Sequence, residues 1–225
     1  MKVKVLLLFG EKDYYMKLLQ TSLKKDRLKL FTVYSSNKKK CKNIFKVENN
    51  YYDFIFCYRS KYILQKNDIK KSKNPPINFH PGPPEYKGFG CINYALYENA
   101  KGYGVTAHII DEKIDNGKIL DIKRFKIKIN DNVESLLKKT HKYLYFHAKK
   151  IIFKVLNNKK NIDKLINKNQ NIKWTNIIKS KQDLDKFYEI DLKLTKIQLN
   201  KKIRATKVKN FKPYIIFHDK RFILN

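Results

Sequence analysis

Two polar residues, Asn78 and His80, stand two positions apart at the end of a short apolar run, and a proline- and glycine-rich turn begins at Pro81. Residues i and i+2 of a β-strand point to the same side of the sheet, so the carboxamide and the imidazole would share one space. An imidazole can move protons near neutral pH, and a carboxamide N–H can donate to a developing oxyanion. The pair therefore predicts proton transfer with oxyanion stabilisation at the end of a strand.

A third group that could complete such a site is Asp115, which follows His80 by 35 positions. A carboxylate can orient an imidazole and hold an ordered water as a proton relay. The sequence Asp115-Asn116-Gly117 is equally typical of an ordinary hairpin turn. A catalytic role for Asp115 therefore depends on the pair of residues upstream.

The remaining histidines are explained better by packing, by the surface or by a turn than by chemistry: His108, His141, His147 and His218. A metal site built from His80, Asp111, Asp115 and the first of these histidines would lack the short ligand spacing of strong metal motifs. We therefore expect no metal.

Apolar periodicity predicts the elements that must position these residues. Six segments have the composition of strands, namely residues 3–9, 28–34, 52–58, 77–80, 104–110 and 117–129. Four segments have the spacing of helices, namely residues 14–25, 63–69, 91–100 and 132–156. Strands that alternate with helices indicate β-α-β units. We predict an α/β, Rossmann-like fold with a mostly parallel twisted sheet and flanking helices.

The C-terminal part is predicted to be a small extension. Residues 157–171 are rich in Asn and Lys and indicate a loose connector, and a polar stretch follows Trp174. Residues 214–224 have the pattern of a β-hairpin that turns at residues 218–220. We accordingly expect a catalytic domain over residues 1–160 and a small subdomain with the terminal hairpin over residues 161–225.

The formal charge of +31 would by itself suggest a nucleic-acid partner. Only five of the 51 basic residues are arginines, however, and arginine is the residue that phosphate and base recognition favours. The abundance of Lys, Asn and Ile is what an AT-rich genome encodes by default. We attribute the charge mainly to codon bias and expect no nucleic-acid partner.

Cysteine usage and hydropathy indicate the cellular compartment in which the protein is expected. The three cysteines are far apart and offer neither a disulfide framework nor a zinc spacing, which favours a reducing cytoplasm. The chain has no apolar run of 18 residues, so we expect no membrane span. The first ten residues are followed by Glu11-Lys12-Asp13 rather than by a small-residue cleavage site, which favours a buried strand over a signal peptide.

The motif Asn78-Phe79-His80, a proline-rich loop, a strand and then Asp115-Asn116-Gly117 together resemble the folate-dependent formyltransferase family. That family has Asn-x-His, a loop ending in Gly, and Asp-x-Gly some thirty residues later. The resemblance covers roughly residues 1–156, and a weaker resemblance is present at residues 203–206. The loop over residues 81–86 is most similar to the branch that acts on nucleotide-linked amino sugars of surface polysaccharides.

The resemblance implies N10-formyltetrahydrofolate as formyl donor and a primary amine as acceptor. Asn78 would then donate to the oxyanion, His80 would take the amine proton or stabilise the oxyanion, and Asp115 would orient the imidazole. Neither a covalent enzyme intermediate nor a metal is needed.

Two sets of binding residues are expected, the first from the family and the second from the glycines of the loop after His80, whose backbone N–H groups can approach oxygen atoms closely. The loops that would cradle the folate, a site we expect at the carboxyl ends of the strands, contribute Arg59, Ser60, Tyr62, Ile63, Asp111 and Lys113. Arg59 could equally be a solvent residue at a strand end. The loop that would contact the sugar or its diphosphate contributes Pro83, Tyr86, Gly88 and Gly90.

Three alternatives stay open. Methionyl-tRNA formylation fits the charge, but about 65 C-terminal residues leave little room for the tRNA-binding domain of that branch. The second is a basic nucleic-acid-binding module without catalysis, against which the three candidate catalytic residues argue. The third is a small-nucleotide transformylase of purine synthesis. The terminal hairpin also offers an edge for a homodimer.

Overall fold

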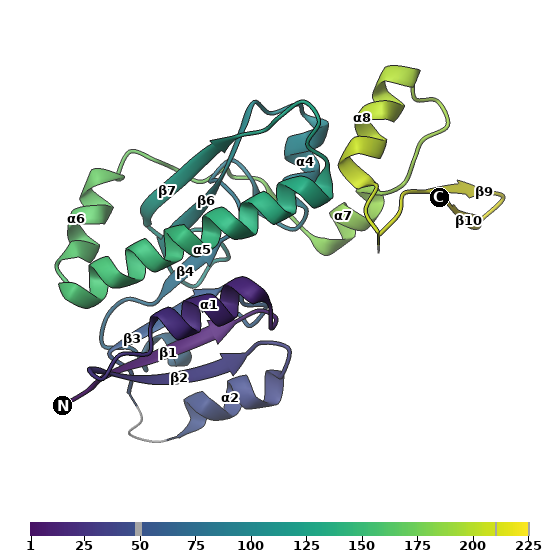
Figure 1. Ribbon diagram of the computed structural model, residues 1–225. Helices are drawn as coiled ribbons and strands as arrows, with labels where there is room; N and C mark the ends of the chain where they lie inside the picture. The colour runs from purple at the N-terminus through teal and green to yellow at the C-terminus, as the bar shows by residue number, and fades with distance from the viewer. Residues whose placement is uncertain (48–50, 210, 225) are drawn as a thin grey trace. The chain divides into compact units, whose positions relative to one another are not determined.

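The computed structural model describes residues 1–47, 51–209 and 211–224. Within these residues, the main sheet has six strands in the order β2-β1-β3-β4-β6-β7 (Figure 1). The pairs β1–β2, β1–β3 and β3–β4 are parallel, and β4–β6 is antiparallel. The strands are β1 (Val3–Phe9), β2 (Leu28–Tyr34), β3 (Phe54–Tyr58), β4 (Ile77–His80), β6 (Gly102–Ile109) and β7 (Ile119–Lys126). The predicted Rossmann-like, mostly parallel sheet is confirmed.

The central strands form because their apolar runs are continuous. Every residue of β3 is buried, as are the last five residues of β1, which is the pattern of strands covered on both faces. One side of these strands packs against Cys41 and Phe45 of the helix α2 (Lys38–Lys46). Because β1, β3 and β4 run in parallel, their carboxyl ends share one edge of the sheet.

The helices flank and connect the strands. They are α1 (Tyr14–Ser22), α2, α3 (Lys66–Ile69), α4 (Cys91–Tyr97), α5 (Val133–Asn157), α6 (Asn161–Lys168), α7 (Lys181–Phe187) and α8 (Lys196–Thr206). Two short strands, β5 (Lys87–Gly88) and β8 (Ile178–Lys179), pair in parallel, and β9 (Tyr214–Phe217) pairs with β10 (Lys220–Ile223) in the predicted terminal hairpin.

Some of the sequence predictions were wrong or incomplete. The supposed loose connector contains α6, which buries Ile162 and Leu165 on one face despite its Asn- and Lys-rich surroundings. The helix α2 was not predicted, although Asn37 caps it by accepting from the backbone N–H of Lys40 at 2.9 Å. The polar stretch after Trp174 contains β8, α7 and α8. Capping boxes begin α7 and α8, and each ties a side chain to the backbone three residues on.

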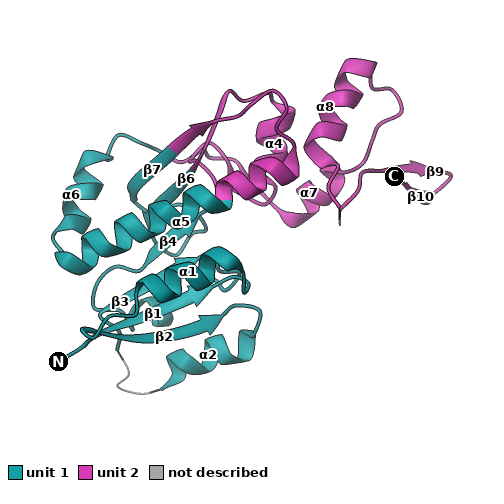
Figure 2. Cartoon of the chain, in the orientation of Figure 1, with its two compact units in different colours: residues 1–81, 105–123, 141–173 teal, residues 82–104, 124–140, 174–225 magenta. Residues whose placement is uncertain are grey.

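The chain forms two compact units, which Figure 2 colours separately. Unit 1 comprises Met1–Pro81, Val105–Lys123 and His141–Lys173. Unit 2 comprises Gly82–Gly104, Arg124–Thr140 and Trp174–Asn225. The division into residues 1–160 and 161–225 stays a prediction.

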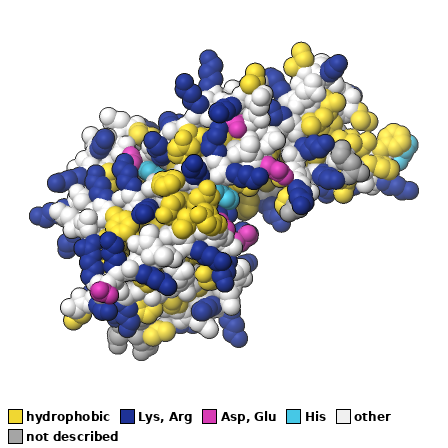
Figure 3. Space-filling view, viewed as in Figure 1, with side chains coloured by type: hydrophobic (Ala, Val, Ile, Leu, Met, Phe, Trp, Pro, Cys, Tyr) yellow, Lys and Arg dark blue, Asp and Glu magenta, His cyan; other side chains and the backbone are white. Residues whose placement is uncertain are grey.

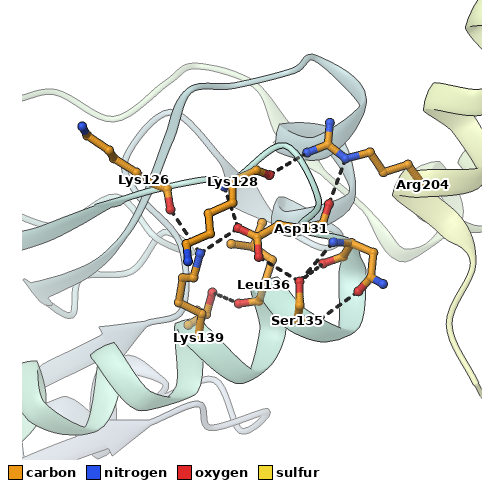
Figure 4. A network of polar contacts seen from close by, with 9 residues as sticks. Lys126, Lys128, Asp131, Ser135, Leu136, Lys139 and Arg204 are labelled. Carbon is orange, nitrogen blue, oxygen red and sulfur yellow. Dashed lines mark hydrogen bonds and ion pairs between the residues drawn. The ribbon is translucent and has the colours of Figure 1, made fainter.

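In unit 2, Arg204 attaches α8 to the segment before α5 (Figure 4). Its Nε donates to the carbonyl oxygen of Asp131 at 2.8 Å and its Nη2 donates to that of Lys128 at 3.3 Å. The Asp131 carboxylate in turn accepts from Lys139 Nζ at 2.7 Å. Burial alone would raise the pKa of Asp131, but these donors lower it. The weaker family resemblance at residues 203–206 thus falls on a residue that holds two segments of unit 2 together.

Lysine and arginine side chains are spread over the face shown in Figure 3 rather than gathered in one patch. In the part of the chain that the structure describes, no helix is long and apolar enough to cross a membrane.

Candidate active site

The strand β4 presents Asn78 and His80 on one side and buries Phe79 on the other. Its antiparallel neighbour β6 brings His108 opposite Asn78 and Thr106 opposite His80. His80 is only 5% exposed. The alternation inferred from the sequence is therefore present at the carboxyl end of β4.

Asp115 joins this pair within unit 1. Its Oδ2 lies 3.3 Å from Nδ1 of His80, and its Oδ1 accepts from Nδ2 of Asn78 at 3.5 Å. The structure thus brings together all three side chains for which the sequence predicts catalytic roles.

His108 also belongs to this cluster, contrary to the structural role that the sequence suggested. Its Nδ1 lies 2.8 Å from the carbonyl oxygen of Ile109 and must carry the proton there, so the neutral ring accepts from Asn78 Nδ2 through Nε2 at 3.0 Å. Nε2 also lies 3.5 Å from Asp115. His108 therefore helps to orient the Asn78 carboxamide. The contact of Asn78 Nδ2 with Asp115 is long, at 3.5 Å, so the second N–H of this amide can donate to another acceptor.

The backbone around Asp115 is held in an uncommon shape. Asp115 has φ of 45°, in the left-handed region that non-glycine residues rarely occupy. Two residues on, a Cβ on Gly117 would lie 1.9 Å from the carbonyl oxygen of Ile109, so the loop can approach the end of β6 only with glycine there. The backbone N–H of Ile109 donates to the carbonyl oxygen of Lys118 at 2.9 Å and fixes this approach.

An open cavity in unit 1 adjoins the cluster. Asn78, His108 and Asp115 line it, and so do five of the six residues predicted for the cofactor, namely Ser60, Tyr62, Ile63, Asp111 and Lys113. Leu64, Ile110 and Ile114 add apolar surface. Burial and a hydrogen bond to Asp68 raise the pKa of Tyr62, so its hydroxyl stays protonated and donates at 3.0 Å. The cavity combines an apolar wall with a few polar groups, which is the usual make-up of a small-molecule site.

Of the described residues, those that line the cavity do not include Arg59, the sixth predicted cofactor residue. Its guanidinium pairs with Asp13, the residue that caps α1 by accepting from the backbone N–H of Met16 at 2.8 Å. Arg59 itself has φ of 54° at the turn that leads from β3 into the cavity loop. The position of Arg59 suits it to hold that loop.

The predicted acceptor-binding residues, Pro83, Tyr86, Gly88 and Gly90, all belong to unit 2. Gly88 and Gly90 have φ of 80° and 74°, which explains the choice of glycine at both positions. Tyr86 donates from its hydroxyl to Glu98 at 2.7 Å. Among the residues that the structure describes, no group of three or more His, Cys, Asp and Glu side chains is arranged to hold a metal ion.

Comparison with known proteins agrees with this geometry. Residues 1–156 match the family model described as formyl transferase. This match covers more than half of the chain, and the chain belongs to the formyl transferase family. It is also 41% identical over 78 residues to the methionyl-tRNA formyltransferase of Thermodesulfovibrio yellowstonii, which is 34% of this chain and 25% of that protein. The chain spans a third or less of the length of the first curated relatives that it matches.

Two crystal structures are similar over nearly the whole chain. A 4-N formyltransferase from Francisella tularensis is 21% identical with a TM-score of 0.73, covering 99% of this chain and 96% of that one. The N-formyltransferase from Helicobacter canadensis, in complex with folinic acid and dTDP-3-aminofucose, is 22% identical with a TM-score of 0.66, covering 97% and 86%. At these identities the likeness shows a shared fold.

Proposed function

We propose that the protein transfers a formyl group from N10-formyltetrahydrofolate to the amine of a nucleotide-linked amino sugar. The observation that carries the proposal is the convergence of Asn78, His80 and Asp115 beside the cavity in unit 1. The mixed apolar and polar lining of that cavity suits a flat heteroaromatic group with polar edges. N10-formyltetrahydrofolate would supply the carbon that is transferred.

The chemistry follows from the positions of the three side chains. When an amine attacks a formyl carbon, negative charge develops on the formyl oxygen, and Asn78 Nδ2 can donate to it. His80 faces Asp115 through Nδ1, which places the proton of the neutral ring there and leaves Nε2 as the atom that accepts the amine proton. Asp115 holds this tautomer and stabilises the imidazolium that forms.

Two observations support a nucleotide-linked amino sugar as the acceptor. The Helicobacter canadensis relative of this fold was solved with an amino-sugar nucleotide and a folate. The scarcity of arginine, and the scatter of lysines over the face shown in Figure 3, argue against a dedicated nucleic-acid surface on that face. Methionyl-tRNA formylation is the competing function, because the sequence match to a methionyl-tRNA formyltransferase reaches 41% identity locally.

One experiment distinguishes formylation of a sugar nucleotide from formylation of methionyl-tRNA. The protein is incubated with formyl-folate and either a panel of thymidine, uridine and guanosine amino-sugar nucleotides or methionyl-tRNA, and mass spectrometry detects the addition of one formyl group. We expect a sugar nucleotide to gain the formyl group and methionyl-tRNA to remain unchanged. Formylated methionyl-tRNA without a formylated sugar would refute the proposal.

We further infer a cytoplasmic role in surface-polysaccharide synthesis and assembly as a homodimer. Cys41, Cys57 and Cys91 are all buried and none of them forms a disulfide, which suits a reducing compartment. In unit 2, the β9–β10 hairpin exposes Phe222 and Ile223 by 47% and 61%, a surface that a second copy could cover. Light scattering should report a dimer, and Phe222→Asp should shift it to monomer. An unchanged mass for the variant would contradict the use of this hairpin.

A further inference from the structure

One wall of the cavity in unit 1 is a loop whose shape has to be fixed by other residues. This loop, residues 60–65, follows β3 and leads into α3, and four of its residues line the cavity, namely Ser60, Tyr62, Ile63 and Leu64. The helix α3 has only four residues, which is too short to be stable on its own. The shape of this wall therefore depends on contacts with side chains outside the loop.

The carboxylate of Asp68, on α3, binds the loop at two points. Its Oδ2 accepts from the hydroxyl of Tyr62 at 3.0 Å and from the backbone N–H of Gln65 at 2.9 Å. Asp68 is only 8% exposed, and a carboxylate so buried costs free energy unless donors satisfy it. Because both of these donors belong to the loop, the carboxylate and the loop hold each other in one arrangement.

The ring of Tyr62 is held from a second side. It lies nearly parallel to the ring of Phe45 on α2, with the centroids 6.1 Å apart and the planes 10° apart. It also packs, partly buried, against the hydrophobic core to which Phe45 and Leu64 belong. Since the hydroxyl proton is bonded to Asp68, Tyr62 offers the cavity a ring surface in a fixed orientation rather than a hydrogen-bond donor.

A role for Asp68 that was confined to α3 would not require the bond to Tyr62. The bond to Gln65 by itself closes the first turn of the helix, where the backbone N–H of Ile69 also donates to the carbonyl oxygen of Gln65 at 3.0 Å. The bond to Tyr62 joins side chains six positions apart and ends at a residue of the cavity wall. Loss of Asp68 should therefore change what the cavity binds as well as the stability of the helix.

We propose that Asp68 is a positioning residue for the formyl donor, holding the ring of Tyr62 in the wall against which the heteroaromatic part of a formyl-folate packs. The inference rests on the proposed function, since it names the residue that shapes the site for the donor. Asp68 is not itself among the described residues that line the cavity, so it acts through Tyr62.

Equilibrium binding of folinic acid, a 5-formyl folate, tests the proposal without any formyl transfer. Asp68→Ala removes the acceptor of both bonds and should raise the Kd about tenfold. Asp68→Asn keeps a side-chain oxygen that can accept, so it should retain most of the affinity. Asn67→Ala changes the exposed neighbour of Asp68 on α3 and should leave the Kd unchanged.

A double variant shows whether Asp68 acts through the ring. Tyr62→Leu should raise the Kd at least as much as Asp68→Ala does, and adding Asp68→Ala to Tyr62→Leu should raise it no further. Additive losses would show that Asp68 supports the fold without positioning Tyr62, and would overturn the proposal. Thermal melting establishes that each variant is folded. If Asp68→Ala is not, Tyr62→Phe breaks the same bond from the other end and should also weaken folinic acid, and an unchanged Kd for it would overturn the proposal.

The outcomes separate this inference from the proposed function. If folinic acid binds and Asp68→Ala loses affinity only where Tyr62 is present, the inference stands, even where no sugar nucleotide is formylated. If sugar nucleotides are formylated but Asp68→Ala binds folinic acid as the unmodified protein does, the inference is refuted and the proposed reaction stands. If folinic acid does not bind the unmodified protein, the inference is refuted whatever the formylation assay shows.

Discussion

Asp115 Oδ2 and His80 Nδ1 lie 3.3 Å apart, and both side chains are nearly excluded from solvent, at 10% and 6% exposure. A carboxylate so placed favours the ring tautomer with its proton on Nδ1. Substituting His80→Ala should abolish formyl transfer while folate binding survives, because the cavity wall is built by other residues. Turnover and equilibrium folate binding measure the two effects, and His218→Ala in the terminal hairpin provides a matched control. Full activity of His80→Ala would end the proposed mechanism.

Asn78 is expected to act on the rate rather than on binding. Its Nδ2 donates to His108 at 3.0 Å and reaches Asp115 at 3.5 Å, so the carboxamide is already oriented before an acceptor arrives. Asn78→Ala should lower kcat by about 10²–10³, the usual effect of removing one oxyanion donor, with little change in KM. A large rise in KM with unchanged kcat would assign Asn78 to substrate binding instead.

The loop that carries Asp115 should tolerate no side chain at position 117. Gly117→Ala would place a methyl group 1.9 Å from the carbonyl oxygen of Ile109, so either β6 or the loop must move. We expect kcat to fall at least tenfold, because a shift of about 1 Å at a reacting group can cost about 10²-fold. Gly102→Ala is the matched control, since its nearest contact would be an ordinary 3.7 Å. Equal activities for the two variants would contradict this account of the loop.

The sequence was sufficient to predict the elements that are encoded by a local pattern of residues. Continuous apolar runs indicated β1, β3 and β4, and the i, i+2 spacing placed Asn78 and His80 on one side of a strand. His108 was missed because it reaches the site only through the antiparallel register of β6 on β4, a long-range pairing that no local pattern encodes. The pairing of β5 with β8 was missed for the same reason, since the two strands are each two residues long and widely separated in sequence.

Arg59 illustrates a residue whose position could be predicted but whose partner could not. The sequence placed it after β3 near the cofactor loop, and the structure pairs it with Asp13 at the start of α1. In addition, the buried Ser35 accepts from the backbone N–H of Lys61 at 2.9 Å, which ties the same loop to the end of β2. The residues that hold the loop therefore come from the start of α1 and from the end of β2.

Breaking the Arg59–Asp13 pair should loosen the cofactor loop. We expect Arg59→Ala and Asp13→Asn each to raise the KM for formyl-folate about tenfold while kcat at saturation changes little, because the catalytic side chains lie on other elements. The double variant should be no worse than either single one, since both remove one interaction. Lys61→Ala breaks the exposed Lys61–Glu11 pair between the same two loops and should have little effect. Additive losses in the double variant would contradict this coupling.

His141 should make stability depend on pH below neutrality. Burial, and then the nearby Arg59 guanidinium, lower its pKa from 6.5 to about 4. Between these two values the unfolded chain binds a proton that the folded protein does not, so the free energy of unfolding falls as the pH falls from 6.5 to 4. The size of this contribution is on the order of 3 kcal/mol. His147, whose pKa is also lowered by burial, adds a change of the same sign.

The contribution of His141 to the free energy of unfolding can be isolated by comparing the unmodified protein with a variant that lacks this imidazole. Urea unfolding of the unmodified protein and of His141→Gln is compared at intervals from pH 7 to pH 3, where His147 titrates in both proteins and cancels. The unmodified protein should lose stability relative to the variant across this window, with the difference levelling below pH 4, once both states carry the proton. A difference that stays constant from pH 7 to pH 4 would show that His141 is as easily protonated in the folded protein as in the unfolded chain. In that case the imidazole would not be held neutral beside Arg59.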